Sequence, residues 1–382
     1  MRTVALEELI EAAPIERAGE QDLPVLSMTR ANGLVPQDRV FNKSVASRDL
    51  TKYKVVRPNQ LVVGIHIDEG ALGVSGDLQV GIVSPAYNLW DIQPEVSIDP
   101  TYLDRFIRSP RAIQYFIANY RKTADRRGKL TRERFLELPV PLPPIEEQRR
   151  IAAVLDAADE LRTKRRQALA KLDTLTQAIF IDMFGDPARN SKGLPALALG
   201  ELGDWRSGGT PPRSNKNHFV GEIPWFSSGD LESEFLTDSS EHVNQEAIDS
   251  TSAKEIPVGS LLLGMYDTAA LKSGVTTRPS SCNQAVAFSR LDDSRVSTRY
   301  VYAAIQLGRE HFKRTQRGIR QKNLNLTMVR EIRIPLPPLH AQREFDDRLV
   351  KIDELRSEVS VTVSRLDTLF ASLQQRAFAG EL

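Results

Sequence analysis

The sequence is poor in the residues that mark secreted, metal-binding and membrane proteins. Its single cysteine, Cys282, excludes an intrachain disulfide. The five histidines are scattered and build no structural zinc pattern, so we expect no bound metal. No run approaches the ~18 unbroken apolar residues of a membrane span, and the first residues include acidic side chains instead of a secretory apolar core. We therefore expect a cytoplasmic protein with no membrane association.

The motifs of common enzymes are also missing. There is no G-x-x-x-x-G-K-[ST] loop, which argues against ATP hydrolysis by this chain, and no glycine fingerprint for a dinucleotide. The [DN]-P-P-[FY] tetrapeptide, with which amino-methyltransferases hold the base they modify, is absent: the Pro-Pro pairs occur as LPPI, TPPR and LPPL. We predict no catalytic residue and no cofactor in this chain.

The composition is that of a globular protein with more than one domain. The chain has 382 residues, of which 41% are hydrophobic and 26% charged. Its formal net charge of +1 neither supports nor excludes a nucleic-acid partner, because such a protein can be basic on one face only.

An internal repeat organises the chain. Residues 141–184 align without gaps to residues 335–378, with 16 of 44 positions identical. The identical positions include a glutamine (Gln148, Gln342), an Asp-Glu-Leu-Arg tetrad that starts at Asp159 and Asp353, and a Leu-Asp-Thr-Leu run. The repeat indicates a duplicated structural unit.

Each copy starts with a proline cluster and continues as a long helix with an apolar seam. Proline stops regular structure before the helix. Apolar residues then follow a 3.5-residue period over about five heptads, which is typical of a coiled coil. The first copy carries two rows, Ile151, Ala158, Leu172, Ile179 and Val154, Leu161, Ala168, Leu175. The second copy carries Phe345, Ile352, Val359, Leu366, Leu373 with Leu355 and Leu369. Arg165 interrupts the first seam and indicates either a register device or an exposed position.

The two helices are expected to pack on each other within the chain. Each would extend ~60 Å at about 1.5 Å per residue, and its apolar stripe needs a partner. Pairing between two chains is the alternative, but the duplication within one chain favours intramolecular packing.

A globular segment precedes each helix. Residues 1–140 and 188–334 are rich in β-branched and aromatic residues broken by Gly, Pro, Asn and Asp, and the long helices occupy 141–187 and 335–382. Candidate helices lie at 100–120 and 297–313. We predict an α+β protein with two mixed, strand-rich domains separated by two long helices that form an intramolecular coiled coil.

Local charge identifies candidate nucleic-acid contacts in both globular segments. Residues 101–134 hold ten Lys or Arg against three Asp or Glu, and a second basic loop precedes the second proline cluster. Lys and Arg contact phosphates, whereas Arg, Asn, Gln and short polar side chains read base edges. The candidates are Arg121, Lys122, Arg126, Arg127, Lys129 and Arg132 in the first segment, with Arg317, Arg320, Gln321, Lys322 and Asn323 in the second. A turn-rich stretch adds Thr210, Arg213, Ser214, Asn215 and Lys216.

The whole pattern resembles a known family. Two variable segments, each closed by I/V-P-L-P-P, a glutamine and a long helix, look like the specificity subunits of type I restriction-modification systems. The first segment's "VASRDLTKYKVVRPNQLVV" and "GIVSPAYNLW" resemble one target-recognition subfamily. The second segment's "SGGTPPRS", "EIPWFSSGDL", "SCNQAVAF" and "QKNLNL" resemble another.

The resemblance implies a function and a set of partners. Each globular domain would recognise one half of a split double-stranded DNA target, with the helices packed antiparallel as the spacer. Two methyltransferase subunits would bring S-adenosylmethionine, and restriction-translocation subunits would use ATP and Mg. The residues expected to contact partners are Gln148, Arg149, Gln342 and Arg343. Because Glu146-Glu147 becomes His340-Ala341 and Arg150 becomes Glu344, partner docking can differ between the two copies.

Two other classes remain as alternatives. The chain could belong to a methyltransferase, against which the missing tetrapeptide and cofactor glycines argue. It could also be a coiled-coil scaffold without a DNA role, in which case binding to duplexes should be absent or independent of sequence.

Overall fold

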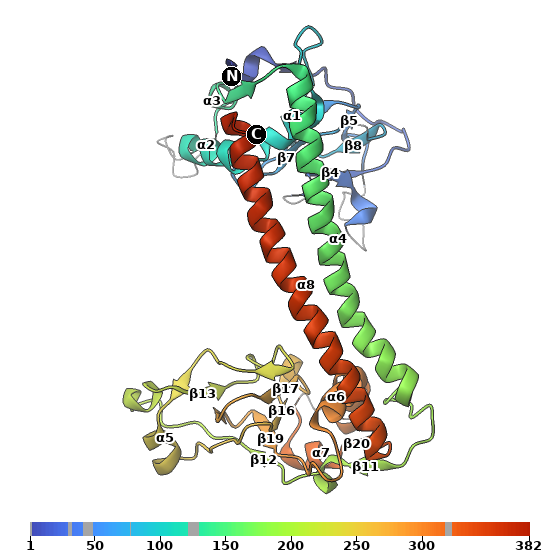
Figure 1. Ribbon diagram of the computed structural model, residues 1–382, viewed down its shortest axis with the longest axis vertical. Coiled ribbons are helices and arrows are strands. Elements are labelled where there is room, and N and C mark those ends of the chain that lie inside the picture. The colour runs from blue at the N-terminus through green and yellow to red at the C-terminus, as the bar shows by residue number, and fades with distance from the viewer. Residues whose placement is uncertain (1, 30–32, 41–48, 77, 121–129, 318–322) are drawn as a thin grey trace. The chain divides into compact units, whose positions relative to one another are not determined.

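The chain folds as two compact units. A computed structural model describes residues 2–29, 33–40, 49–76, 78–120, 130–317 and 323–382 (Figure 1). Unit 1 comprises Met1–Arg166 with Val361–Leu382, and unit 2 comprises Gln167–Ser360. Each unit therefore contains one predicted globular segment and half of each predicted long helix.

Two long helices begin directly after the proline clusters. They are α4 (Ile145–Phe184) and α8 (Leu339–Ala379). In unit 1 the first turns of α4 pack against the last turns of α8, since Ile151 and Leu155 share a buried core with Phe370 and Phe378. The Arg162 guanidinium Nε also donates to Asp367 Oδ1 at 2.8 Å, which links the two helices.

Unit 2 repeats this arrangement with the helices exchanged. Phe180 and Phe184, in the last turns of α4, share a core with Phe345 and Leu349 near the start of α8. The helices therefore run antiparallel within each unit. This confirms the predicted α+β fold class with two strand-containing parts and an intramolecular, antiparallel helix pair.

The first predicted apolar row is more buried than the second. Ile151 and Ile352, in the first row, are 2% and 4% exposed. The second row leaves four leucines about half exposed: Leu161 (52%), Leu175 (41%), Leu355 (49%) and Leu369 (50%). Val154 and Ala168 of the second row are half-buried, as Ala158 and Leu172 of the first row are. The four leucines are therefore the exposed part of the two rows. Among the described residues, no helix combines the length and the apolar content needed to cross a membrane.

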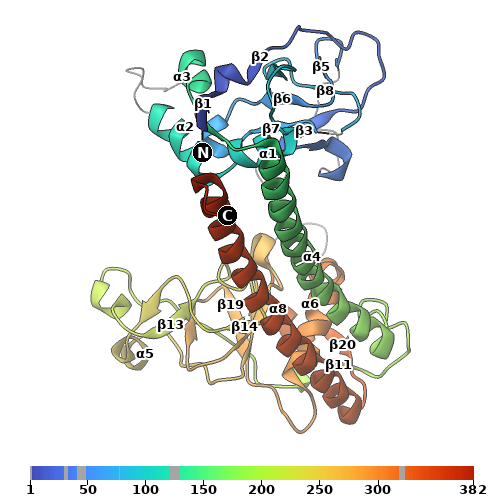
Figure 2. The same ribbon diagram turned by 45° about the horizontal axis from the view of Figure 1, so that its top comes forward.

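Unit 1 is built on an antiparallel sheet. Its strand order is β2-β9-β6-β7, and the unit also contains the two-stranded pairs β1-β10, β3-β4 and β5-β8. Figure 2 labels β2, β6 and β7 of this sheet. The strands are β1 (Arg2–Ala5), β2 (Ile10–Ala12), β3 (Leu26–Thr29), β4 (Gly33–Pro36), β5 (Lys54–Val56), β6 (Gln60–Val63), β7 (Leu72–Val74), β8 (Gly81–Val83), β9 (Asn88–Ile92) and β10 (Pro139–Leu142). Short 3-10 turns lie at Leu6–Glu8, Gln37–Arg39 and Ile67–Glu69. Tyr102, Phe106 and Phe116 from helices pack with Leu61 and Trp90 from the sheet.

The helix predicted at 100–120 is two helices. The structure contains α1 (Pro100–Ile107) and α2 (Pro110–Tyr120), followed by α3 (Arg132–Leu136). Pro110 breaks the helix because it has no backbone donor and keeps Ser109 out of the helical region. The helix predicted at 297–313 has no internal proline and continues as α6 (Thr298–Arg317).

Unit 2 has a five-stranded mixed sheet among its described residues, in the order β12-β19-β16-β17-β14. The groups β15-β13-β18 and β11-β20 complete it. The strands are β11 (Ala196–Ala198), β12 (Arg206–Ser207), β13 (Ile223–Phe226), β14 (Phe235–Leu236), β15 (His242–Val243), β16 (Leu261–Gly264), β17 (Ser273–Thr276), β18 (Ser281–Cys282), β19 (Val286–Ser289) and β20 (Arg333–Pro335). The remaining elements are α5 (Gln245–Ser250), α7 (Leu326–Glu331) and 3-10 turns at Leu199–Glu201, Lys216–Phe219 and Asp267–Ala269.

The two units share a set of strand pairs and hydrogen bonds, although their globular sequences differ. In each, a strand leading into a long helix pairs antiparallel with the first strand of the unit, as β10 does with β1 and β20 with β11. A buried tyrosine hydroxyl donates to a proline carbonyl of that strand, from Tyr102 to Pro141 at 2.8 Å and from Tyr300 to Pro335 at 2.6 Å. The duplication therefore extends beyond the helices into the globular parts.

Candidate nucleic-acid interface

The structure describes about half of the predicted nucleic-acid contacts. Outside the described residues lie Arg121, Lys122, Arg126, Arg127, Lys129, Arg320, Gln321 and Lys322. Arg317 ends helix α6, and Asn323 is exposed two residues before Asn325, which caps α7 by accepting from the Met328 amide. The other predicted residues can be placed in detail.

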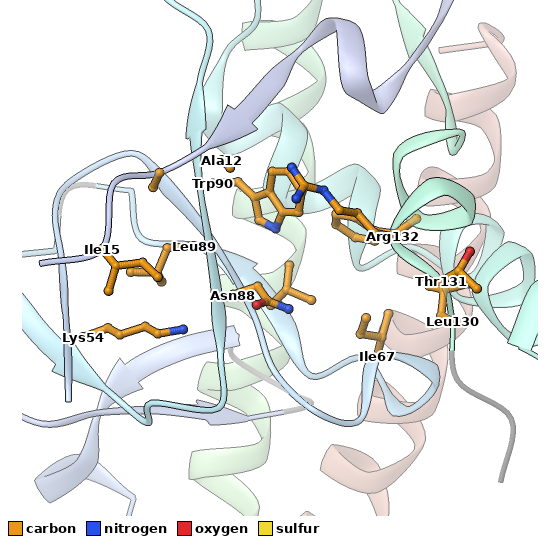
Figure 3. Close-up of a pocket in the computed structure, with 13 residues that line it drawn as sticks. Ala12, Ile15, Lys54, Ile67, Asn88, Leu89, Trp90, Leu130, Thr131 and Arg132 are labelled. Carbon is orange, nitrogen blue, oxygen red and sulfur yellow. The ribbon is translucent and has the colours of Figure 1, made fainter. Parts of the chain in front are cut away.

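Arg132 lines a pocket in unit 1, where its side chain lies beside Trp90 (Figure 3). It is the first residue of α3, and its guanidinium carbon lies 4.9 Å from the centroid of the Trp90 ring, within the range of a cation-π contact. The pocket has a volume of about 300 Å³. Its lining includes Ala12, Ile15, Lys54, Ile67, Asn88, Leu130, Thr131 and Phe135.

The pocket in unit 1 is cationic and largely apolar. Lys54 and Arg132 are the charged residues of its lining, and no acidic side chain among the described residues lines it. The Lys54 ammonium donates to the Tyr87 carbonyl at 2.6 Å, which holds the side chain in place. Burial lowers the pKa of Lys54. Arg132 is exposed and leaves its polar edge available at the surface.

Arg213 of unit 2 also lies over aromatic rings, but it is paired with a carboxylate. Its guanidinium carbon lies 4.5 Å from the Phe219 ring centroid and 5.2 Å from that of Trp225. Both terminal nitrogens bond the carboxylate of Glu241, one of them at 2.8 Å. The hydrogen bonds from Arg213 hold the pKa of the Glu241 carboxyl below its usual range.

The other predicted residues near Arg213 are exposed or form hydrogen bonds with one another and with nearby side chains. Asn215 caps the turn Lys216–Phe219 by accepting from the Asn217 amide at 3.1 Å, and its amide nitrogen lies 3.0 Å from His218 Nε2. The Thr210 hydroxyl donates to the Gln284 amide oxygen. Ser214 and Lys216 are exposed. Unit 2 thus presents a polar surface whose side chains are in part held by one another.

The two predicted partner glutamines are fully buried. Gln148 accepts from the Asp99 amide at 2.8 Å and donates to the carbonyls of Ser97 and Pro143. Gln342 accepts from the Ser297 amide at 2.8 Å and donates to the Pro337 carbonyl. This leaves no surface of either side chain for a partner, so the structure assigns both a role inside their own units.

Each buried glutamine joins the start of a long helix to the loop before α1 or α6. The adjacent Arg149 and Arg343 are exposed. Partner contact stays a prediction for these two arginines.

A pair of equivalent arginines was not predicted from the sequence. In unit 1, Arg105 on α1 bonds Asp156 at 2.7 Å and Asp159 at 3.0 Å on α4. In unit 2, Arg299 on α6 bonds Asp353 on α8 at 2.8 Å, and also Glu234 at 2.6 Å. Asp159 and Asp353 open the repeated Asp-Glu-Leu-Arg tetrad, so the repeat itself carried the signal for these contacts.

Comparison with known proteins identifies the family. The profile of the type I restriction modification DNA specificity domain matches residues 108–172 and 196–361. That is more than half of the chain, which therefore belongs to this family.

Individual relatives agree with the assignment. The chain is 26% identical over 174 residues to the specificity subunit of the type I restriction enzyme EcoR124I/EcoR124II of Escherichia coli, covering 44% of this chain and 43% of that protein. It is 26% identical over 195 residues to the HindI specificity subunit of Haemophilus influenzae, covering 50% and 42%. The matches thus span less than half the length of these relatives.

A solved structure shares the fold over the whole chain. A chain from an assembly of the type I R-M system superposes with a TM-score of 0.63 at 19% identity, covering 100% of this chain and 98% of that one. At this identity the similarity supports the fold alone.

Proposed function

We propose that this chain recognises DNA sequence as the specificity subunit of a type I restriction-modification complex, acting in the cytoplasm. The observation that carries the proposal is that both units have the same internal hydrogen bonds but different exposed surfaces. Both units hold their helices through the same buried glutamine and tyrosine contacts. Their exposed surfaces differ, as the environments of Arg132 and Arg213 show. Two such units would read two different half-sites of double-stranded DNA.

The long helices would set the gap between the half-sites. Half-sites that are met on one face of a duplex recur about every 34–36 Å. A helix of 40 residues such as α4 extends ~60 Å, which is ample for a spacer of this length. Packing α4 against α8 inside each unit stiffens both ends of that spacer.

Catalysis would belong to partner subunits. In the proposed complex, methyltransferase subunits bring S-adenosylmethionine, and restriction-translocation subunits bring ATP and Mg. This chain would position them on its target through recognition alone, with no cofactor of its own.

The uncovered leucines fit the docking of two equivalent partners. Unit 1 exposes Leu161 of α4 and Leu369 of α8, whereas unit 2 exposes Leu355 of α8 and Leu175 of α4. These are the same two repeat positions in both units. A helical partner could cover one pair in each unit, which supports two methyltransferase subunits per chain.

Replacing the exposed leucine pair of one unit with lysines should therefore prevent one methyltransferase subunit from binding. The double variant Leu161→Lys and Leu369→Lys is expected to lower the number of bound methyltransferase subunits from two to one, since Lys in an apolar interface loses the burial of both leucines. Native mass spectrometry of the complex measures the stoichiometry. The exposed polar residue Lys171, changed to alanine, serves as the control. Retention of two tightly bound subunits by the double variant would contradict this surface.

Exchange of one globular segment tests the proposed function. Replacing residues 1–140 with the equivalent segment of a family member that has another target should change one half of the recognised sequence and preserve the other half and the gap. Selection of bound duplexes from a random library measures this, with specific sequences expected to bind at least about 10³-fold tighter than random ones.

Two outcomes of this selection and one separate binding assay decide between the classes of protein. A change in both halves would contradict the assignment of one half-site to each unit. Binding without sequence preference would favour a scaffold. Binding of labelled S-adenosylmethionine by the chain alone would favour a methyltransferase.

A further inference from the structure

Trp90 is a buried residue that lines the pocket of unit 1. It lies on β9, is 6% exposed, and its ring centroid is 5.8 Å from that of Phe135. Alternate residues of a strand point to the same face, so Asn88 shares the face of Trp90. Figure 3 shows Asn88, Trp90 and Arg132 around the same hollow.

Arg132 is held by the aromatic ring and not by a carboxylate. Its guanidinium lies over Trp90, and within the described ranges no acidic side chain forms an ion pair with it. A cation-π contact fixes the plane of a guanidinium while its N–H edge stays free to donate. The neighbouring Arg134 differs, because it pairs with Glu137 at 2.7 Å.

Unit 2 provides an internal comparison. Arg213 also lies over a tryptophan, but Glu241 occupies both of its terminal nitrogens. The two stacked arginines occupy different places in their units, since Arg132 begins α3 and Arg213 lies in the loop between β12 and β13. Glu241 neutralises Arg213, whereas Arg132 forms no ion pair with any residue that the structure describes.

Asn88 adds a second group suited to base edges. It is exposed at the same pocket, and its side-chain amide makes no hydrogen bond to any residue that the structure describes. Arginine bonds the O6 and N7 atoms of guanine with two donors, and asparagine bonds the N6 and N7 atoms of adenine. Both chemistries therefore converge on one cationic hollow with no acid among its described lining residues.

We propose that Arg132, oriented by Trp90, and Asn88 form a base-reading site of unit 1. Arg132 is the specificity-determining residue for a guanine of one half-site, and Asn88 contacts an adjacent base. This inference rests on the proposed function, because it names the contacts through which one unit reads DNA. It also separates Arg132 from the predicted phosphate contacts, for which a fixed guanidinium plane would not be needed.

Conservative variants of the full chain distinguish base reading from phosphate contact. Arg132→Lys keeps the charge but loses the paired donors. We expect it to lower discrimination at one G·C base pair of one half-site by about 10- to 100-fold and to leave the other half-site unchanged. Asn88→Ala should relax a different position in the same half. Arg134→Lys, two residues along the same helix, should leave all preferences intact.

The measurement is selection from a random duplex library, followed by affinities for single-base variants of the target, with thermal unfolding as a check on folding. If Arg132→Lys keeps every wild-type preference, or Arg132→Ala weakens all sequences equally, the base-reading site is refuted while the proposed function stands. If the wild-type chain selects no sequence at all, the proposed function fails and the site fails with it. These two failures are distinguished by the wild-type selection alone.

Discussion

Replacing Phe378 with alanine is expected to destabilise unit 1 by about 3–5 kcal/mol, the usual cost of removing a buried phenylalanine. Phe378 is 1% exposed, and its ring centroid lies 5.7 Å from that of Tyr102 and 5.2 Å from that of Phe106. It belongs to the last turns of α8, a helix that begins in unit 2. The loss of its side chain should therefore destabilise unit 1, although α8 begins in unit 2.

Phe184→Ala should have the reciprocal effect. This residue is 3% exposed near the end of α4, and its ring centroid lies 5.0 Å from that of Tyr300 in unit 2. Although α4 begins in unit 1, the variant should destabilise unit 2 by a similar amount. The two phenylalanines occupy equivalent positions in the repeat, so the pair forms a matched test.

Hydrogen exchange resolves the two effects by unit. Phe378→Ala should increase exchange in α1 and spare α6, and Phe184→Ala should do the opposite. Leu369→Ala, on α8 but about half exposed, is the control and should cost less than about 1 kcal/mol. Loss of protection in the unit where each altered helix begins would contradict the exchanged packing of the helix ends.

The helices and the duplication could be predicted because they repeat in the sequence. Proline clusters, a sustained apolar period and 16 of 44 identical positions are enough to define both copies. The shared framework of the globular parts could not be predicted in this way. Its contacts join positions far apart in the chain, such as the Tyr102 hydroxyl and the Pro141 carbonyl, and tolerate different sequences around them.

The candidate site shows where inference from residue type reaches its limit. Gln148 and Gln342 recur in both copies, which is equally compatible with a shared partner and with a shared internal hydrogen-bond pattern; the burial of both amides decides for the latter. Arg213 reads as an exposed groove contact in its polar stretch, yet its charge is paired with Glu241. The ion pair between Arg213 and Glu241 depends on the fold, because the two residues are far apart in the sequence. The contact of Arg132 with Trp90 depends on how strand β9 is placed in the sheet, and local composition does not specify that placement.

Lengthening both helices by one heptad should abolish binding to the original target, with a loss of at least about 100-fold, because only one half-site can then be contacted at a time. A heptad adds about 10.5 Å to a helix, which equals about three base pairs of duplex. The insertion points follow from the structure: the units divide after Arg166 in α4 and after Ser360 in α8. Duplicating residues 160–166 and 354–360, which both begin Glu-Leu-Arg, keeps the helical period and the contacts inside each unit.

Selection from a library with all gap lengths should return the same two half-sites, separated by a longer gap that brings them back into reach of both units. Replacing residues 160–166 with a copy of 354–360 changes the sequence of the spacer without changing its length, and should leave the gap as it was. The double insertion and the length-preserving replacement therefore separate the effect of spacer length from that of spacer sequence. If the lengthened chain still prefers the original gap, the helices do not set the distance between the half-sites, and another contact between subunits must do so.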